Sequence, residues 1–500
     1  MKPDLTLTVP PADRLGRVHL VGTGGVGMAG IARILLARGV PVSGSDAADS
    51  PALRSLAALG ATVHVGHDAA HVADADTLVV TSAARDTNPE LVEARRRNLL
   101  VLHRAQALAA LLAGRRAVAV AGTHGKTTTT SMLTVALRHA GLDPSFAIGG
   151  ELTEGGDSAA EGTGDVFVAE ADESDGTFLL YSPTVAVVTN VEPDHLDHYG
   201  TADAVTAAFD AFAERVVPGG VLVTCADDPG AARLAAAVRA RRGPGAVRTY
   251  GVGEDADVRV AGLDASGPGA RFALQADGLP TVAVTLRVPG AHNALDAAAA
   301  YAAGTWLGAD PHLLADGLAG YGGARRRFES KGVAAGVRVL DDYAHHPSEV
   351  SAVLGAVRGV SGEGRVLAVF QPHLYSRTRI FADDFGRALG LADDVVVLDV
   401  YGAREDPEPG VTGELVSRAV PLPADRVAFE PDRAAAVRRL AGRAAPGDVV
   451  LTLGAGDVTR LGPQLLELLA SRAPDPGPDP NPDPDPAEGT VPQPAGGPRG

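Results

Sequence analysis

Short apolar runs alternate with segments of helical spacing along most of the chain, and many of these runs end in glycine or in polar residues. The first run is Arg17-Val18-His19-Leu20-Val21, followed by a glycine turn, a predicted helix over residues 28–38 and a second strand over residues 40–46. Strands that alternate with helices are typical of parallel sheets covered by helices. We therefore predict an α/β protein that opens with a Rossmann-like βαβ unit.

The alternation continues and predicts further strands, at residues 62–65, 77–81, 117–121, 166–170, 185–189, 221–224, 337–340, 365–370, 394–400 and 448–453. Between residues 247 and 288 the pattern changes to short alternating stretches with frequent turns, which predicts a small antiparallel β part.

Composition breaks divide the chain into three units and two terminal segments. The break Ala113-Gly114-Arg115-Arg116 ends the first unit, and the sequence after Ala473 becomes rich in proline and aspartate, which predicts a disordered tail. The predicted division is an N-terminal extension (1–15), a Rossmann-like unit (16–113), a central unit (114–323), a second Rossmann-like unit (324–472) and the tail (473–500). We expect that deleting the residues after Arg472 leaves the activity unchanged.

A candidate phosphate-binding loop follows the apolar run at residues 117–121. Its residues are Gly122, Thr123, His124, Gly125, Lys126, Thr127 and Thr128. Backbone amides at a helix N-terminus favour phosphate, a lysine reaches the terminal phosphates and a threonine hydroxyl ligates magnesium. The loop is a short variant, because the glycine expected five positions before Gly125 is replaced by Val120. The alternative is an ordinary turn with a solvated lysine.

Two further strands of the central unit end in residues suited to metal-assisted phosphoryl transfer. Glu170 ends one predicted strand and His195 follows the next, where α/β sheets place ligand-facing groups. With the phosphate loop, these two strand ends could hold two cations against ATP and an acidic second substrate. For the neighbouring Glu173, Asp175, Asp197 and His198 we favour a solvated loop. His292-Asn293 opens an alanine-rich helix, where Asn293 could pair with adenine or simply cap the helix.

The N-terminal glycine turn is open to two interpretations. Gly22, Gly24 and Gly27 match the dinucleotide pattern, and Asp46 ends the second strand, where a ribose-binding carboxylate is expected. A nicotinamide cofactor fits this pattern, and so does any sugar nucleotide that carries a diphosphate. The turn could also serve packing alone, and Asp46 could be a capping or surface residue.

Composition narrows the class of protein. The 500 residues are 45% hydrophobic and carry 44 basic against 61 acidic side chains, a net charge of −17, which argues against general affinity for nucleic acid or anionic membranes. One cysteine, Cys225, excludes intramolecular disulfides, and the N-terminus has no apolar signal segment. We expect a cytoplasmic protein without membrane insertion.

The motifs GTHGKTTT, AEADESDG, TNVEPDHLDHYG, PGAHNALDAAAA, GARRRF, DDYAHHPSEV and QPHLYSRT occur in an order that resembles the Mur ligases of peptidoglycan synthesis. The resemblance covers residues 16–470. It implies three domains and an ATP-dependent reaction, in which the lactyl carboxylate of UDP-N-acetylmuramate becomes an acyl phosphate that the amine of L-alanine attacks. It also implies a UDP-sugar site in the first domain, ATP and Mg²⁺ as requirements, and a monomer or homodimer.

The resemblance also implies roles for individual residues. The catalytic set is Lys126, Glu170, His195, Arg327, His345 and Arg377. The implied metal ligands are Thr127, Glu170 and His195, and the phosphate loop with His292, Asn293 and Asp342 forms the implied ATP site. Tyr343, His345, His346 and Arg377 form the implied amino-acid and substrate set. The UDP-sugar set is Gly22, Gly24, Gly25, Val26, Gly27, Met28 and Asp46.

Some positions depart from the family pattern, and some alternatives remain. Asp296 stands where the pattern has a second asparagine, and Leu374 where it often has arginine. His345-His346 could be a polar loop or a structural metal pair, although no third ligand lies nearby in the sequence. The functional alternatives are a sister ligase that recycles a murein tripeptide, a folate-extending ligase, a nicotinamide-dependent dehydrogenase, and a sugar-nucleotide sensor without catalysis.

Overall fold

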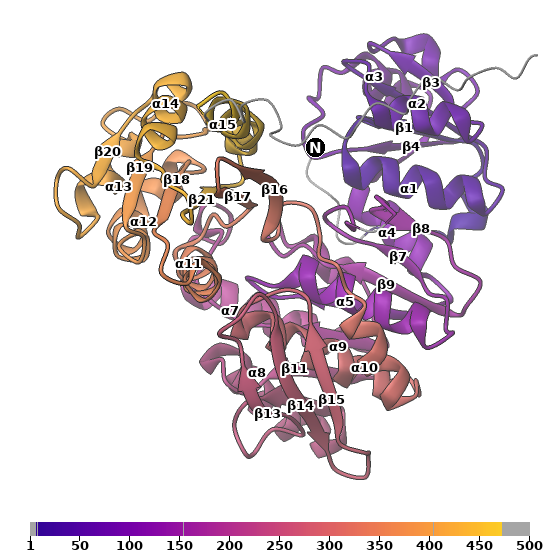
Figure 1. Cartoon of the computed structure of the whole chain (residues 1–500). Coiled ribbons are helices and arrows are strands. Elements are labelled where there is room, and N and C mark those ends of the chain that lie inside the picture. The colour runs from indigo at the N-terminus through magenta and orange to yellow at the C-terminus, as the bar shows by residue number, and fades with distance from the viewer. Residues whose placement is uncertain (1–6, 8, 154, 404, 473–500) are drawn as a thin grey trace, which may run out of the picture.

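The computed structural model describes residues 7, 9–153, 155–403 and 405–472, so the predicted tail and about half of the N-terminal extension (residues 1–6 and 8) lie outside the described residues. Figure 1 shows three lobes, each built around its own sheet with helices packed on it. The predicted α/β class with Rossmann-like first and third units is confirmed, and the predicted strands are present with small shifts at their ends.

The first lobe contains a five-stranded parallel sheet. Its strands, in spatial order, are β3 (Thr62–Val65), β2 (Val42–Asp46), β1 (Val18–Val21), β4 (Thr77–Val80) and β5 (Leu100–His103). Its helices are α1 (Val26–Ala37), α2 (Pro51–Ala58), α3 (Pro89–Arg96) and α4 (Arg104–Leu112), with short η1 (Ala12–Arg14) and η2 (Ala69–Val72). Because β1 is central, the glycine turn that follows it lies at the point where the strand order reverses, the usual ligand crevice of such sheets.

The central lobe contains a ten-stranded sheet. In spatial order its strands are β15 (Val282–Leu286), β14 (Ala270–Ala276), β13 (Val258–Asp264), β12 (Val247–Gly251), β11 (Val221–Cys225), β10 (Val185–Val188), β6 (Arg116–Ala121), β9 (Val166–Glu170), β7 (Ser145–Ala147) and β8 (Ala159–Ala160). Strands β13, β14 and β15 pair antiparallel, as predicted. The prediction that the whole segment 247–288 is antiparallel is wrong for β12, which extends the parallel sheet beside β11.

The central sheet is covered by α5 (Lys126–His139), η3 (Thr177–Leu180), α6 (Leu196–Tyr199), α7 (Ala202–Glu214), α8 (Pro229–Arg242), η4 (Pro244–Ala246), α9 (Ala291–Trp306) and α10 (Pro311–Ala319). The alanine-rich stretch of α9 is fully buried in the same core as α5. Small side chains let these two helices approach closely beneath the phosphate loop, which fixes the position of the N-terminus of α5.

The third lobe contains a six-stranded sheet. Its strands, in spatial order, are β16 (Glu329–Ala334), β17 (Val337–Asp342), β21 (Val449–Leu453), β18 (Val366–Phe370), β19 (Asp394–Val397) and β20 (Val427–Phe429). All pairs except β16 with β17 are parallel. The helices are α11 (Pro347–Ser361), α12 (Tyr375–Leu389), α13 (Gly413–Ala419), α14 (Arg433–Arg443) and α15 (Leu461–Ala470), with η5 (Asp457–Arg460) before the last.

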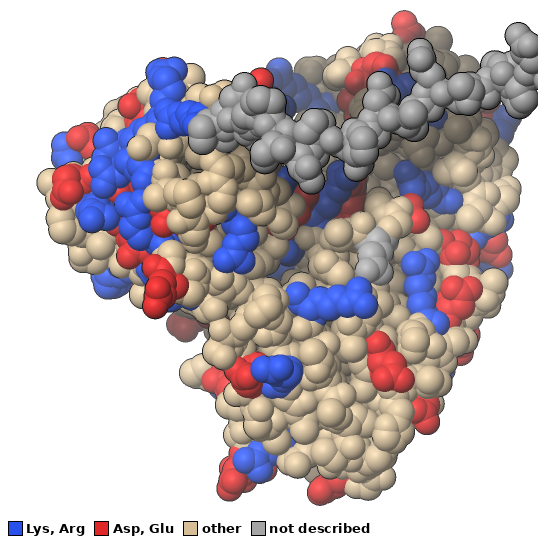
Figure 2. Space-filling model, in the orientation of Figure 1, with Lys and Arg blue, Asp and Glu red and all other residues tan. Residues whose placement is uncertain are grey.

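Acidic and basic side chains are intermixed on the face drawn in Figure 2, and the lower lobe there carries few charges. The net negative charge therefore does not gather into one field on this face. Within the part of the chain that the structure describes, no helix combines the length and the apolar character needed to cross a membrane.

Candidate functional site

The phosphate loop joins β6 to α5 and is tightly closed. Gly122 has φ 135°, and a Cβ there would lie 1.9 Å from the Thr189 hydroxyl, so only glycine fits. The Lys126 ammonium donates to the carbonyls of Gly122 (2.7 Å) and Thr123 (3.1 Å) and to Glu173 Oε1 (2.9 Å). Burial alone would lower the pKa of Lys126, but Glu173 and the other nearby carboxylates outweigh it and raise the pKa. The lysine therefore stays charged at the helix N-terminus, where phosphates bind.

Thr127 and Glu170 meet beside this lysine. β9 lies next to β6 in the sheet, so Glu170 at its end faces the first turn of α5. The Thr127 hydroxyl lies 3.1 and 3.0 Å from the two carboxylate oxygens of Glu170, and the Gly149 amide donates to Glu170 Oε2 (2.7 Å). A Cβ on Gly149 would collide with this carboxylate. The hydroxyl and carboxylate form an oxygen donor set of the kind that Mg²⁺ prefers.

His195 lies on the other neighbouring strand end, after β10. Its Nε2 is 3.3 Å from Glu173 Oε1 and 3.6 Å from Asp194 Oδ2. Glu173 is 2% exposed and joins His195 to Lys126. The prediction of a solvated loop is wrong for Glu173, because the chain after β9 turns back over the phosphate loop rather than out into solvent.

Asp194 pairs with Arg377 from α12 in the third lobe. The guanidinium lies 2.9 and 3.0 Å from the two carboxylate oxygens, and both side chains are buried. Burial alone would raise the pKa of Asp194, but Arg377 holds it well below its usual range. Arg377, the predicted substrate-binding arginine, is therefore paired in this structure with a carboxylate of the central lobe. Sequence reasoning missed Asp194 as its partner.

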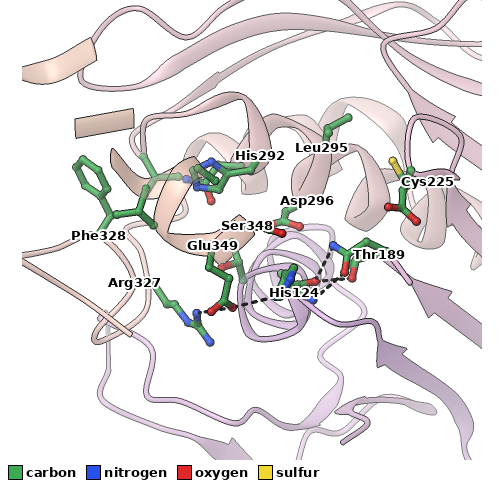
Figure 3. Close-up of a pocket in the computed structure, with 18 of the residues that line it drawn as sticks. His124, Thr189, Cys225, His292, Leu295, Asp296, Arg327, Phe328, Ser348 and Glu349 are labelled. Atoms are coloured by element: carbon green, nitrogen blue, oxygen red, sulfur yellow. Dashed lines mark hydrogen bonds and ion pairs between the residues drawn. The ribbon is translucent and has the colours of Figure 1, made fainter. Parts of the chain in front are cut away.

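A cavity of about 320 Å³ lies between the carboxyl end of the central sheet and the third lobe. Figure 3 shows His292, Leu295 and Cys225 along its wall, with Arg327 and Glu349 at the side of the third lobe. Asn293 also lines the cavity, and its amide donates to the Pro289 carbonyl (2.6 Å). The volume of the cavity is at the lower end of the range for small-molecule sites, and both apolar and polar side chains line the cavity.

Two carboxyl groups at the cavity are electrostatically unusual. Asp296 accepts from the Thr129 hydroxyl (3.0 Å), and burial raises its pKa to about 7. Asp342 accepts from the amides of Phe328 and Ala344 (2.7 Å each), and burial raises its pKa to about 6 despite Arg327. Asp342 therefore holds the chain just before β16 and just after β17, and it also lines the cavity.

Glu349, in the first turn of α11, connects several predicted site residues. It accepts from the backbone amides of His345 (2.9 Å) and His346 (3.2 Å), and its carboxylate lies 3.8 Å from Arg327. Arg327 also lies over the Tyr343 ring, 5.2 Å from its centroid. Burial lowers the pKa of His345 to about 3, so this histidine is neutral near pH 7.

His124 of the phosphate loop faces the third lobe. Its Nδ1 is 3.3 Å from Glu349 Oε1 and its Nε2 is 3.5 Å from Glu192 Oε2. Burial alone would lower the pKa of His124, but these two carboxylates raise it to about 9. Sequence reasoning missed both glutamates as partners. Glu349 lies in one of the family motifs and Glu192 in another, but nothing local in the sequence pointed to either as a partner of His124.

The first lobe presents the predicted glycine turn at the end of β1. The Gly24 amide donates to Asp46 Oδ2 (2.8 Å), so Asp46 stabilises the turn itself. The Met28 side chain is buried in the core, which leaves only its backbone to face a ligand. Arg104, which begins α4, reaches the turn, since a Cβ on Gly27 would lie 3.1 Å from its guanidinium. Sequence reasoning missed this cation.

Three family models match the chain. "Mur ligase family, catalytic domain" matches residues 17–116, "Mur ligase middle domain" residues 120–304, and "Mur ligase, glutamate ligase domain" residues 326–456. Each match falls on one of the three sheets.

Individual proteins are similar over almost the whole chain. The UDP-N-acetylmuramate–L-alanine ligase of Kineococcus radiotolerans is 64% identical over 92% of this chain and 97% of its own length. The protein of the same name from a Nocardioides species is 61% identical over 92% and 98%. Among solved structures, the UDP-N-acetylmuramate-alanine ligase of Thermotoga maritima aligns with a TM-score of 0.74 at 28% identity, covering 91% of this chain and 99% of that one.

Proposed function

The chain belongs to the Mur ligase family, and from this premise we propose that it joins L-alanine to the lactyl carboxylate of UDP-N-acetylmuramate at the expense of ATP. One observation carries the proposal. The chain is 64% identical to a UDP-N-acetylmuramate–L-alanine ligase, and its Lys126, Thr127 and Glu170 lie together at the ends of two adjacent strands. The curated relatives at 54 to 64% identity share that name, which favours this function over a tripeptide-recycling ligase or a non-catalytic sensor.

The residues present fit Mg²⁺. Thr127 and Glu170 offer oxygen donors, and two buried atoms nearby, His195 Nδ1 and Glu173 Oε2, have no hydrogen-bond partner among the described residues. We propose that Thr127 and Glu170 hold one ion and that His195 helps to hold a second. Bound there, Mg²⁺ would neutralise charge on the phosphates and on the substrate carboxylate.

Lys126 is the group on this chain that stabilises the transferred phosphoryl. Its ammonium is anchored by two loop carbonyls and by Glu173, which hold its position before the nucleotide arrives. Exchange of the Glu173 contact for a phosphate oxygen would keep the ammonium fully paired. A preorganised cation of this kind is a large contribution in phosphoryl transfer.

We propose that the cavity beside α9 receives the nucleoside part of ATP, with Asn293 and His292 near adenine and Asp342 near the ribose. Burial lowers the pKa of His292 to about 4, so it is neutral and can accept or donate a hydrogen bond. Arg327 enters from the third lobe, so the site needs both lobes in place.

The sugar nucleotide would approach the phosphate loop from the first lobe, and the amino acid would approach it from the third lobe. We propose that the glycine turn after β1 binds the UDP diphosphate through backbone amides and that Arg104 supplies the cation. Arg377 and the neutral His345 would face L-alanine. Because the proposed reaction consumes ATP, we also propose that the protein acts in the cytoplasm.

Phosphate release from ATP and Mg²⁺ tests the function. We expect release only when UDP-N-acetylmuramate and L-alanine are both present, with glycine and L-serine weaker, since one methyl group is worth about 1 to 3 kcal/mol of discrimination. Release with a murein tripeptide but not with L-alanine would contradict the proposal.

Two variants separate the roles within that assay. Lys126→Ala should lower release at least about 100-fold while calorimetry shows unchanged binding of UDP-N-acetylmuramate. Arg104→Ala should raise the KM for the sugar nucleotide and leave the KM for ATP unchanged. Loss of sugar-nucleotide binding in Lys126→Ala would show that the two sites are not separate.

A further inference from the structure

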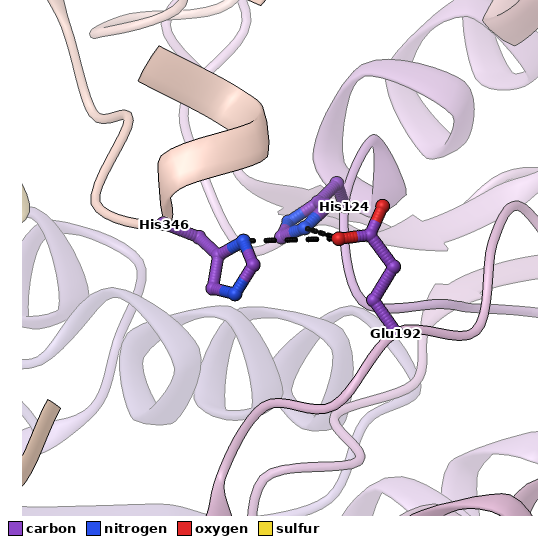
Figure 4. A group of neighbouring side chains, drawn as sticks. All are labelled: His124, Glu192 and His346. Carbon is purple, nitrogen blue, oxygen red and sulfur yellow. Dashed lines mark ion pairs between the residues drawn. The ribbon is translucent and has the colours of Figure 1, made fainter. Parts of the chain in front are cut away.

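Three side chains from different parts of the chain meet beside the phosphate loop, as Figure 4 shows. They are His124 of the loop, Glu192 after β10 and His346 at the start of α11. Glu192 Oε2 lies 3.5 Å from His124 Nε2 and 3.9 Å from His346 Nδ1, and one ligand atom from each residue lies within 4.8 Å of the others. The sequence offered no third ligand near His346, because both partners lie far away in the chain.

The imidazole nitrogens of this cluster are buried without partners. His346 is 4% exposed, and neither of its ring nitrogens has a hydrogen-bond partner among the described residues. The same holds for His124 Nε2. Burying a polar nitrogen without a partner costs about 1 to 3 kcal/mol. Two of these nitrogens, His124 Nε2 and His346 Nδ1, face the same carboxylate oxygen of Glu192, which indicates a missing ligand between them.

Surrounding groups orient the cluster. Glu349 lies against Nδ1 of His124, on the opposite side of the ring from Glu192, which leaves Nε2 free to bind. A carboxylate on the far nitrogen is the usual support of a metal-binding histidine. Ser348 donates to Glu192 Oε2 (2.6 Å) and fixes the carboxylate in turn.

We propose that His124, Glu192 and His346 bind a divalent transition-metal cation such as Zn²⁺. Two imidazoles and one carboxylate favour Zn²⁺ or Co²⁺ over Mg²⁺, which prefers oxygen ligands. Tetrahedral bonds of about 2.05 Å place ligand atoms about 3.3 Å apart. The distances from Glu192 Oε2 to His124 Nε2 (3.5 Å) and to His346 Nδ1 (3.9 Å) lie close to this value, and the two imidazoles would approach each other from within 4.8 Å. The fourth position is left for water.

The site is accessible and distinct from the proposed Mg²⁺ ligands. A surface hollow lined by Glu192, His346 and Phe381 leads to it, and the nucleotide cavity touches it from the other side. It shares no residue with Thr127, Glu170 and His195. Because His346 belongs to the third lobe and the other two ligands to the central lobe, the cation clamps the third lobe against the phosphate loop.

Titration of the metal-free full-length protein with Co²⁺ in excess Mg²⁺ tests the site. We expect one Co²⁺ per chain with the strong visible absorption of a tetrahedral site, displacement by Zn²⁺, and an X-ray absorption spectrum with two imidazole ligands. Uptake of no Co²⁺ under these conditions overturns the proposal, because a proton on His124 then accounts for the cluster.

Variants locate the bound ion. Glu192→Gln is nearly isosteric and should weaken Co²⁺ binding by at least about 100-fold with an unchanged circular dichroism spectrum, and Ser348→Ala about tenfold. His71→Ala is the matched control, because His71 belongs to another cluster, around the buried Glu90 in the first lobe. Binding that survives Glu192→Gln or disappears in His71→Ala overturns the proposal.

Discussion

At the scale of the residue, Asp296 shows how burial makes one side chain imitate another. The family pattern has asparagine at this position, and here the carboxyl is 7% exposed with its pKa raised from 3.8 to about 7. Near pH 7 a large part of the carboxyl is therefore protonated, and in that form it is neutral and can donate a hydrogen bond as an asparagine amide does. The substitution thus preserves hydrogen bonding without a fixed charge behind the phosphate loop.

Asp296→Asn should stabilise the protein in a pH-dependent way. An acid whose pKa is raised on folding binds a proton more tightly in the native state. The contribution of Asp296 to the free energy of unfolding is therefore intact below pH 4 and is lost as pH rises through 7. The stabilising effect of the variant should therefore grow by about 2 to 3 kcal/mol between pH 5 and pH 8. Thermal unfolding without nucleotide at the two pH values measures it.

The exposed Asp255 provides the control for this comparison. Asp255→Asn should change the melting temperature equally at pH 5 and pH 8. An equal effect of Asp296→Asn at both pH values would mean that Asp296 is ionised throughout this range in the folded protein.

Lys126 and Glu170 could be predicted individually because the first begins a helix and the second ends a strand. Lys126 and Glu170 lie where the apolar runs placed them. Glu173 was misjudged, since a run of acidic residues has the composition of a solvated loop and only the backbone path after β9 buries it. Asp46 supports the glycine turn through Gly24, a contact that does not exclude the predicted role at the ribose.

At the scale of the element, apolar runs identified the parallel strands well, and β9 and β3 match their predicted bounds. Helix α5 begins at Lys126 and includes four successive threonines, although threonine is a poor helix former. In the structure Thr130 and Thr134 donate to the carbonyls four residues earlier, which satisfies their hydroxyls within the helix. Strands β5, β7, β8, β16 and β20 were not predicted, because each is short or weakly apolar.

The ion pair between α12 and the loop after β10 leads to a prediction at this scale. Asp194→Asn leaves the Arg377 guanidinium buried without a countercharge, which should cost about 3 kcal/mol or more of stability. The double variant Asp194→Asn, Arg377→Gln should recover most of this stability and yet remain inactive, because Arg377 is proposed to bind substrate. The free energy of unfolding and the rate of phosphate release, measured on the parent, each single variant and the double variant, form a double-mutant cycle.

An active double variant would contradict that role for Arg377 and leave it as a contact between lobes only. A single variant as stable as the parent would show that the interface opens easily and hydrates the arginine.

At the scale of the whole molecule, the site depends on how the third lobe docks on the central one. His124, Asp194 and Glu192 each contact residues of that lobe, and the nucleotide cavity has walls from both. No local pattern encodes such contacts, since the partners are distant in sequence and meet only after both sheets have formed. This explains why the motifs predicted the chemistry but not Glu192, Asp194 or Glu349.

We propose that ATP phosphorylates the lactyl carboxylate before the amine of L-alanine attacks it, and one isotope experiment tests this order of steps. With both oxygens of the lactyl carboxylate labelled with ¹⁸O, attack on ATP places one labelled oxygen in the acyl phosphate bridge, and attack by the L-alanine amine expels it as phosphate. Mass spectrometry should then find one ¹⁸O in each inorganic phosphate and one in each amide product. Unlabelled phosphate, or labelled phosphate without an L-alanine amide, would contradict the account.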